Sequence, residues 1–183
     1  MSIFRYKFHE FLSADIPDRD VYFTLFKYLE PKNSVTDNHK LIHTMSFIDV
    51  RTMMDYFSGK RQVNGDAIAW MVAAVSECQE KYIYQCDTFE VFSVLNFIRN
   101  EVQKLIENEN FRLADSMPDA KAIQAGVDVF NQFGIYNELE KLSGGNVLLW
   151  QQCMDMPYYL AFKKLHIEHE TAQFQRRYSQ IKN

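Results

Sequence analysis

The chain has 183 residues, a formal net charge of −4 and a sequence pI near 5.7, which argues against a generally basic nucleic-acid-binding protein. No stretch approaches the roughly 18 uninterrupted apolar residues that span a bilayer. Glycine, at 6 residues, and proline, at 4, are each at about half of their usual frequency of roughly 7% and 5%, which excludes a turn-dense sandwich or barrel and favours helices.

The first predicted helix lies in residues 16–31. Pro17 and Asp18 stand at its beginning and Pro31 follows its end, as expected at helix boundaries. The polar segment that follows, PKNSVTDNHK, is predicted to be a mobile loop. Apolar residues recur at helical spacing along the helix and are expected to face the core: Val21, Leu25, Phe26 and Leu29.

A second helix is predicted in residues 46–59. Ser46 and Asp49 fit a capping box at its start, and Gly59 is a natural terminator. A helix of about three turns follows from this spacing. Its expected inward stripe consists of Phe47, Val50, Met54 and Phe57.

Residues 64–111 contain two strongly patterned helices. The first opens with an Asn-Gly turn and is expected to be capped by Asp66, and the second begins at Asp87 with Glu90 three residues on. The YIY segment at 82–84 is compatible with a short strand, although no obvious partner strand exists. The first helix should bury Ile68, Met71, Val72, Val75 and Cys78, and the second, the longest core helix, Val91, Leu95, Ile98, Val102, Leu105 and Ile106.

The remaining chain is predicted to form shorter helices and one long terminal helix. A helix in 120–134 should end at Gly134 and direct Ile123, Val127, Phe130 and Phe133 inward. A short helix in 135–145 should stop at the Gly144–Gly145 pair, Asn146 should cap 147–156, and Pro157 should begin a last helix, 157–181. Trp150 and Met154 should fill the interior, with the tyrosines near the rim.

These elements predict an all-α fold, an irregular bundle of seven or eight helices in a single domain, residues 1–183. The helix 157–181 is a candidate docking element. It carries Lys163, Lys164, Arg176, Arg177 and Lys182 against Glu168 and Glu170, so residues 157–183 have a charge of +3, and the chain before them has −7. Such a helix can dock on an acidic protein surface or contact a phosphate backbone, or it can be a terminal helix with a solvated polar face.

No common enzyme signature is present, so we predict a protein that is not an enzyme and that needs no cofactor. The nearest approach to a metal site is HIEHE, in which His166 and His169 share a helix face with Glu170 adjacent. Without further ligands, solvated or partner-facing histidines explain this motif better. The carboxylates of the segments IENEN and NELE are interpreted as solvated side chains. Cys153 is a nucleophile only if a histidine approaches it in space.

The three cysteines, Cys78, Cys86 and Cys153, form no Cys-x-x-Cys pair and are expected to be reduced and structural. The beginning, MSIFRYKFHEF, is interrupted by charges and resembles no signal peptide, so an intracellular location is expected. Aromatic residues make up 15% of the chain, which is more than a small core readily hides. Some of these rings are therefore expected to contact a partner.

The segment AIAWMVAAVSECQEKYIYQCDTFEVFSVLNFIRNEV, residues 67–102, resembles a pattern in baseplate hub and tail assembly proteins of contractile-tailed bacteriophages. The segment LLWQQCMDMPYYLAFKKLHIEHETAQF is similar to the ends of small tail chaperones and baseplate components. The resemblance implies a viral structural or assembly protein that binds other tail proteins. Such a protein would be present in the host cytoplasm during assembly, and either remain in the virion or leave after assembly. The resemblance places the family's framing Asp and Arg at Asp87, which would cap its helix, and at Arg99, which would either anchor an inter-helix hydrogen bond or contact a partner. An intramolecular ion pair of Arg99 is an equally good interpretation.

Two functions therefore stand as hypotheses. The first is a non-enzymatic interaction protein of a viral tail or baseplate, and the second is a small helical regulatory factor that binds a host protein or nucleic acid through its basic C-terminal helix. A metal-dependent helical enzyme is a third, weaker possibility. The candidate partner-binding residues are Arg99, Tyr158, Tyr159, Lys163, Lys164, Arg176 and Arg177.

Overall fold

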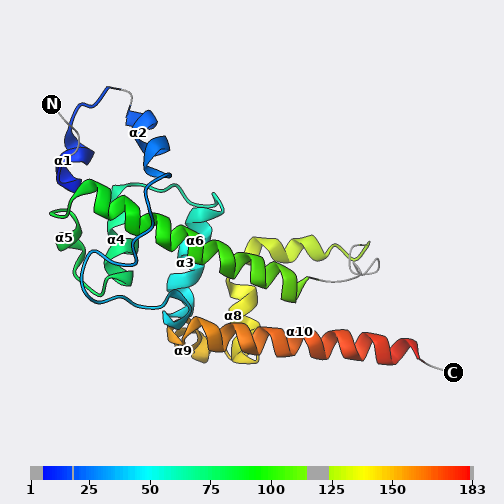
Figure 1. The fold of residues 1–183 in the computed structure, drawn as a ribbon. Helices are drawn as coiled ribbons and strands as arrows, with labels where there is room; N and C mark the ends of the chain where they lie inside the picture. The colour runs from blue at the N-terminus through cyan, green and yellow to red at the C-terminus, as the bar shows by residue number, and fades with distance from the viewer. Residues whose placement is uncertain (1–5, 18, 115–123, 182–183) are drawn as a thin grey trace. The chain divides into compact units, whose positions relative to one another are not determined.

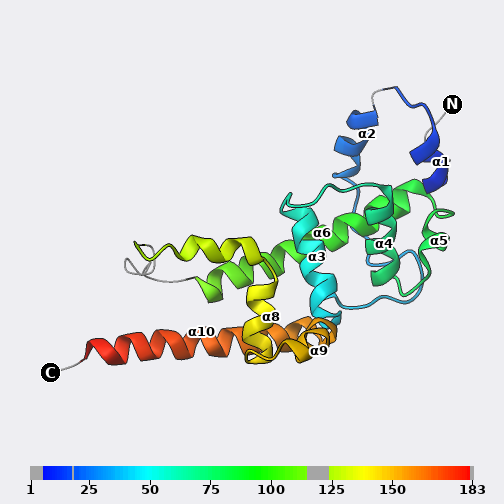
Figure 2. The same ribbon diagram turned by 180° about the vertical axis from the view of Figure 1, so that it is seen from behind.

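A computed structural model describes residues 6–17, 19–114 and 124–181. The all-α fold is confirmed, because the described residues form helices and no strand, with only isolated bridges between extended residues (Figures 1 and 2). Seven helical segments in this part of the chain have at least seven residues, in agreement with the expected seven or eight. The longest is α6 (Thr88–Leu113), as predicted, followed by α10 (Tyr158–Gln180).

The chain separates into two compact units. Unit 1 comprises residues 1–42 and 52–104, and unit 2 comprises residues 43–51 and 105–183. Two helices contribute residues to both units, namely α3 (Phe47–Phe57) and α6. The single-domain organisation stays a prediction, and each unit is described by itself.

Unit 1 is organised around the aromatic ring of Phe92 on α6. It also contains α1 (Phe8–Ser13), α2 (Arg19–Phe26), α4 (Gly65–Val75) and α5 (Glu80–Ile83). Ring centroids from α1 and α2 lie 4.4 to 6.1 Å from that of Phe92, in tilted or edge-on arrangements that aromatic quadrupoles favour. We call this set the Phe92 cluster: Phe8, Phe11, Phe23, Phe26 and Phe92.

The predicted helix starts in unit 1 are partly confirmed. Asp87 caps α6, because its carboxylate accepts a hydrogen bond of 2.8 Å from the backbone N–H of Phe89. The cap of α4 was assigned to the wrong residue: the side chain of Asn64 accepts from the N–H of Ala67 at 2.8 Å, and Asp66 instead accepts from the Tyr84 hydroxyl at 2.6 Å. The asparagine of the Asn-Gly pair is therefore itself the N-cap of α4.

One further prediction in unit 1 was wrong, and one question that the sequence left open is answered. Val21 and Leu25 of α2 are 54% and 55% exposed, because the helix packs through Phe23 and Phe26, whose rings join the Phe92 cluster and bury more apolar surface than aliphatic side chains do. The segment 82–84 is not a strand, since Tyr82 and Ile83 belong to α5. The absence of a pairing partner explains this, as a lone strand leaves its backbone groups unsatisfied.

The polar segment 33–40 is held in place by hydrogen bonds within unit 1. Ser34 is buried, and its hydroxyl donates to the carbonyl of Asn38 at 2.5 Å. The hydroxyl of Thr36 donates to the carbonyl of Ser76, while the Ser76 hydroxyl accepts from the N–H of Val35. The backbone N–H of Lys40 donates to the carbonyl of Val75 at 2.8 Å. This loop is therefore attached to the C-terminal end of α4.

Unit 2 contains the 3₁₀ helices η3 (Val127–Phe133) and η4 (Val147–Leu149) and the helices α8 (Tyr136–Ser143), α9 (Trp150–Asp155) and α10. The predicted boundaries hold here: Gly134 ends η3, Gly144 ends α8 with a left-handed φ of 62°, and the side chain of Asn146 accepts from the N–H of Leu148. In unit 2, α8 and α9 lie near the N-terminal part of α10, whose C-terminal part runs on past them (Figures 1 and 2).

The expected inward face of residues 120–134 was wrong. The described part forms a 3₁₀ helix, and Val127, Phe130 and Phe133 are 42% to 55% exposed. A spacing of three places these side chains on one face of a 3₁₀ helix. The apolar face therefore exists, but it is exposed to solvent. Ile123 lies outside the described residues. In α9, Cys153 is the buried residue, whereas Trp150 and Met154 are half-buried.

Candidate interaction surface

The start of α10 is fixed to the start of α3 by backbone hydrogen bonds within unit 2. The N–H of Phe47 donates to the carbonyl of Met156 at 2.8 Å, and the N–H of Tyr158 donates to the carbonyl of Met45 at 2.9 Å. Ser46 and Pro157 form an isolated antiparallel bridge between these bonds. The Ser46 hydroxyl also accepts from the N–H of Asp49 at 3.2 Å, which confirms the predicted cap of α3.

A partly buried set of charged and hydroxyl side chains fixes the same end of α10. The Arg51 guanidinium contacts Glu109 through Nη1 at 2.6 Å and Glu138 through Nε at 2.7 Å. The Tyr158 hydroxyl donates to the other oxygen of Glu109 at 2.6 Å. We call Arg51, Glu109, Glu138 and Tyr158 the Arg51 network. Its members come from α3, α6, α8 and α10, so the guanidinium links α3 to α6 and α8, and Glu109 links these helices to α10.

Burial controls the ionisation of this network. It lowers the pKa of Arg51, but the charges of Glu138 and Glu109 outweigh it and hold that pKa above its usual value. Burial raises the pKa of Glu138, and Arg51 opposes the rise without cancelling it. Burial and the Glu109 charge raise the pKa of Tyr158. The tyrosine therefore stays a protonated donor to Glu109.

The sequence interpretation missed this network. Glu109 lies in the segment IENEN and Glu138 in NELE, and both were interpreted as solvated carboxylates, whereas their side chains are only 12% and 33% exposed in contact with Arg51. No local signal marks them, because the three charges are separated by 58 and 29 positions along the chain, as the numbering shows. An arginine on the predicted buried stretch of α3 was the available hint, since a buried cation requires anionic partners.

Tyr158 was predicted to bind a partner, but its side chain is not accessible. It is 2% exposed, stacks on Phe162 at 6.1 Å and belongs to the Arg51 network, because its position at the first turn of α10 faces inward. Its neighbour Tyr159 is 46% exposed and its ring lies 6.4 Å from that of His43, edge to face. The adjacent tyrosines therefore differ in exposure, and a role of Tyr159 in partner binding stays a prediction.

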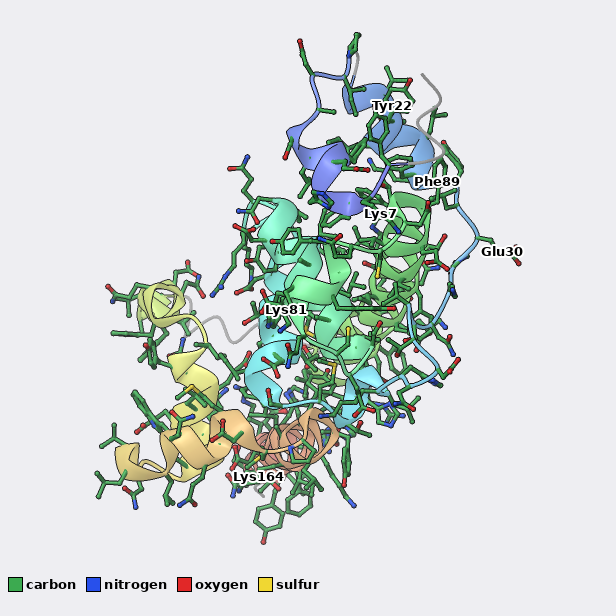
Figure 3. The ribbon with its side chains drawn as sticks, turned by 90° about the vertical axis from the view of Figure 1, so that its left-hand side faces the viewer. Lys7, Tyr22, Glu30, Lys81, Phe89 and Lys164 are labelled. Carbon is green, nitrogen blue, oxygen red and sulfur yellow. The ribbon has the colours of Figure 1, made fainter. Side chains whose placement is uncertain are left out.

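The basic residues proposed for binding are exposed on α10. Lys164 pairs with Glu168 at 2.6 Å along the same helix, and Figure 3, which views α10 close to end-on, marks this lysine on it. Lys163, Arg176 and Arg177 are also exposed. Their role as partner-binding residues stays a prediction.

Arg99 lies in unit 1 and makes intramolecular contacts. Its Nη1 donates to the side-chain oxygen of Asn96 at 3.1 Å, and its guanidinium lies 5.8 Å from the centre of the Phe57 ring. The amide of Asn96 in turn donates to the carbonyls of Phe26 and Leu29 at 2.8 and 3.0 Å. Arg99 is half-buried, and burial lowers its pKa. The hydrogen bond of Arg99 stays within α6, and the contact of Arg99 with another helix is the one with the Phe57 ring of α3, so an inter-helix hydrogen bond does not describe these contacts. A role of Arg99 in partner binding stays a prediction.

The histidines of HIEHE lie on α10. His166 stacks on Phe162 at 6.1 Å and its Nε2 lies 3.7 Å from Glu170, four residues on. Among the described residues, no group of three or more His, Cys, Asp or Glu side chains has an arrangement that could hold a metal ion. All three cysteines are free thiols, and burial raises the pKa of each, Cys153 included, which favours the unreactive protonated form.

The outward face of α10 is apolar although it is not covered. Only Tyr158, Ala161 and Leu165 of this helix are buried, and from His166 to Gln180 no residue is buried. Large apolar side chains with exposed fractions between 45% and 77% follow the helix at helical intervals of seven, four or three residues. We call this set the outward stripe: Leu160, Ile167, Phe174, Tyr178 and Ile181.

Comparisons with protein-family models, with curated proteins and with solved structures find no match for this chain. Within the described residues, none of the helices combines the length and the apolar character required to cross a membrane.

Proposed function

We propose that this chain is a non-enzymatic interaction protein that binds another protein through α10. The observation that supports this is the outward stripe, a row of exposed apolar side chains on a helix whose other face is firmly attached to unit 2. Contiguous apolar surface on a soluble protein commonly marks an interaction site. The Arg51 network and the backbone bonds to α3 would hold this helix in one place for binding.

The test is a charged substitution on the outward stripe. Ile167→Glu together with Phe174→Glu should abolish co-purification of the partner from the native source and leave the unfolding midpoint within a few degrees, because both side chains are exposed. The matched control is Gln175→Glu, on the same helix outside the stripe. Unchanged partner recovery with the double variant would remove the support for this function.

The narrower proposal is that the partner belongs to a viral tail or baseplate. Its support is the resemblance of residues 67–102 to tail assembly proteins of contractile-tailed bacteriophages. Mass spectrometry of the proteins recovered with the chain from its native source should identify tail components. Recovery of unrelated proteins alone would contradict this assignment.

The exposed cations of α10 favour a second candidate, a regulatory factor that binds nucleic acid or an acidic host protein. Lys163, Arg176 and Arg177 lie on the solvent-exposed surface of the helix. Binding to phosphates should weaken by orders of magnitude between about 50 and 200 mM salt if several phosphates are contacted. An apolar interface should change little over this range, so a salt titration of complex formation distinguishes the two functions.

A further inference from the structure

We propose that the outward stripe of α10 is covered by the same stripe of a second copy of this chain, in an antiparallel helix pair centred on Ile167. This inference rests on the proposed function, because it names the partner of the same surface. A pair of identical helices is the simplest closed arrangement for a self-complementary patch.

The helix geometry provides the apolar part of the interface. Residues seven apart advance almost two full turns of an α-helix, so Leu160, Ile167 and Phe174 lie above one another on one face. Leu165 is 7% exposed and Ile167 is 55% exposed, although only two positions separate them, because they face opposite sides of the helix. A second helix on the stripe therefore approaches from the side opposite to the one that packs on unit 2.

The charged side chains beside the stripe allow opposite charges to meet when two identical helices pair. At 100° per residue, Lys163 and Glu170 lie on the same flank, four positions before and three positions after Ile167. In an antiparallel pair centred on Ile167, Lys163 of each copy lies beside Glu170 of the other, and this contact occurs twice. Lys164 lies on the opposite flank and is already bonded to Glu168 at 2.6 Å, and His166 lies 3.7 Å from Glu170 within its own helix.

The charges of α10 disfavour two other arrangements. In a parallel pair, the flank that carries Lys163 faces the opposite flank of the second copy, which places Lys163 beside Lys164 of that copy. An antiparallel pair centred between Ile167 and Phe174 would bring Lys163 close to Arg177 of the second copy on the same flank. Like charges at a helix interface are unfavourable. Of these three arrangements, the one centred on Ile167 combines opposite charges with apolar contacts.

In this register Ile167 packs against Ile167 of the second copy, and Phe174 packs against Leu160. The contact length from 160 to 174 is about 21 Å at a rise of 1.5 Å per residue. One such helix pair is smaller than a standard interface of about 1,600 Å². We therefore expect a concentration-dependent dimer with a dissociation constant on the order of micromolar.

Sedimentation velocity over a range of protein concentrations tests the pairing. The wild-type chain should shift from monomer to dimer, Ile167→Glu should remain monomeric, and Gln175→Glu should behave as wild type. A wild-type chain that stays monomeric up to millimolar concentration would overturn the inference. So would an Ile167→Glu variant that dimerises as the wild type does.

A charge exchange tests the register. Glu170→Lys should weaken the dimer by about three- to tenfold, since it replaces two opposite-charge contacts by repulsion at an exposed position. The double variant Lys163→Glu with Glu170→Lys should recover wild-type affinity. A double variant as weak as the single one would show that these two side chains do not meet, and the register would be wrong.

The outcomes separate this inference from the proposed function. If the chain is monomeric and the Ile167→Glu, Phe174→Glu variant still loses a different protein partner, self-pairing is wrong and the proposed function stands. If the chain neither dimerises nor loses any partner in that variant, both fall. Dimerisation that Ile167→Glu disrupts supports both.

Discussion

Each of the two units is stabilised internally by a different kind of interaction. Unit 1 has the Phe92 cluster, in which rings pack at several tilts and no charge is required. Unit 2 has the Arg51 network, in which one cation contacts two carboxylates and a tyrosine completes the set. Apolar packing loses stability with the volume removed, whereas a buried charge network fails when a single partner is missing. The two units should therefore differ in how they respond to substitution and to pH.

The largest effect is expected for Phe92→Ala. The ring is buried and contacts rings from α1 and α2, so its removal should cost about 4 kcal/mol of the free energy of unfolding, the usual range for a buried phenylalanine. Urea denaturation followed by circular dichroism measures this loss. Phe92→Leu is the control and should retain much of the stability. A loss below about 1 kcal/mol for Phe92→Ala would contradict the central role of this ring.

Arg51→Met should cost about 3 kcal/mol, because it leaves the partly buried carboxylates of Glu109 and Glu138 without their cation. Adding Glu109→Gln and Glu138→Gln should recover part of the loss, since the uncompensated charges disappear. Arg177→Met, at an exposed position, is the matched control and should be nearly neutral. Equal stability of the single and triple variants in urea denaturation would show that the charges are not the cause.

Tyr158→Phe should cost about 2 kcal/mol, the usual value of a hydrogen bond to a charged group, because Glu109 loses its hydroxyl donor while the ring keeps its stacking on Phe162. Tyr159→Phe on the adjacent exposed residue should change the unfolding free energy by less than about 0.5 kcal/mol. Thermal or urea unfolding compares the two. Similar effects for both tyrosines would contradict their opposite placement.

The smallest effect is a pH dependence from Glu138. Its pKa in the folded chain is raised above the ordinary value of 4.5, so the folded state binds its proton more tightly than the unfolded state. The associated stability is fully present below pH 4.5 and is lost as the pH rises through the raised pKa. The unfolding free energy of wild type minus that of Glu138→Gln should therefore decrease as the pH rises from 4.5 through the raised pKa, and it should be constant at higher pH. A difference that increases with pH would show that folding lowers the pKa of Glu138 and does not raise it.

Local signals in the sequence predicted the helix boundaries well. Ser46, Asp87 and Asn146 accept hydrogen bonds from the first turns of their helices, and Gly144 ends α8, since caps act over three or four residues that are adjacent in sequence. For α4, the sequence offered two possible caps in the same turn, Asn64 and Asp66, and the wrong one was chosen. Such signals require no knowledge of distant parts of the chain.

Long-range pairing was not predictable from the same patterns. Glu109 and Glu138 have the sequence surroundings of solvated carboxylates, and only the fold brings Arg51 to them. The exposed apolar residues of η3 and α10 have the periodicity of a core face, because periodicity reports that a face is apolar and not what covers it. For α10, the basic and exposed character of the helix was foreseen, and the burial of Tyr158 was not.

The attachment of residues 33–40 to α4 determines where foreign sequence can be introduced. The carbonyls of Val75 and Ser76 at the end of α4 receive their hydrogen bonds from Lys40 and Thr36, so deletion or replacement of this segment would leave helix-terminal acceptors without donors. In the exposed turn at 60–63, the N–H groups of Lys60 and Arg61 donate to the carbonyl of Asp55 at the end of α3. The exposed residues that follow, Gln62 and Val63, are therefore the better position for an affinity tag or a fluorescent label.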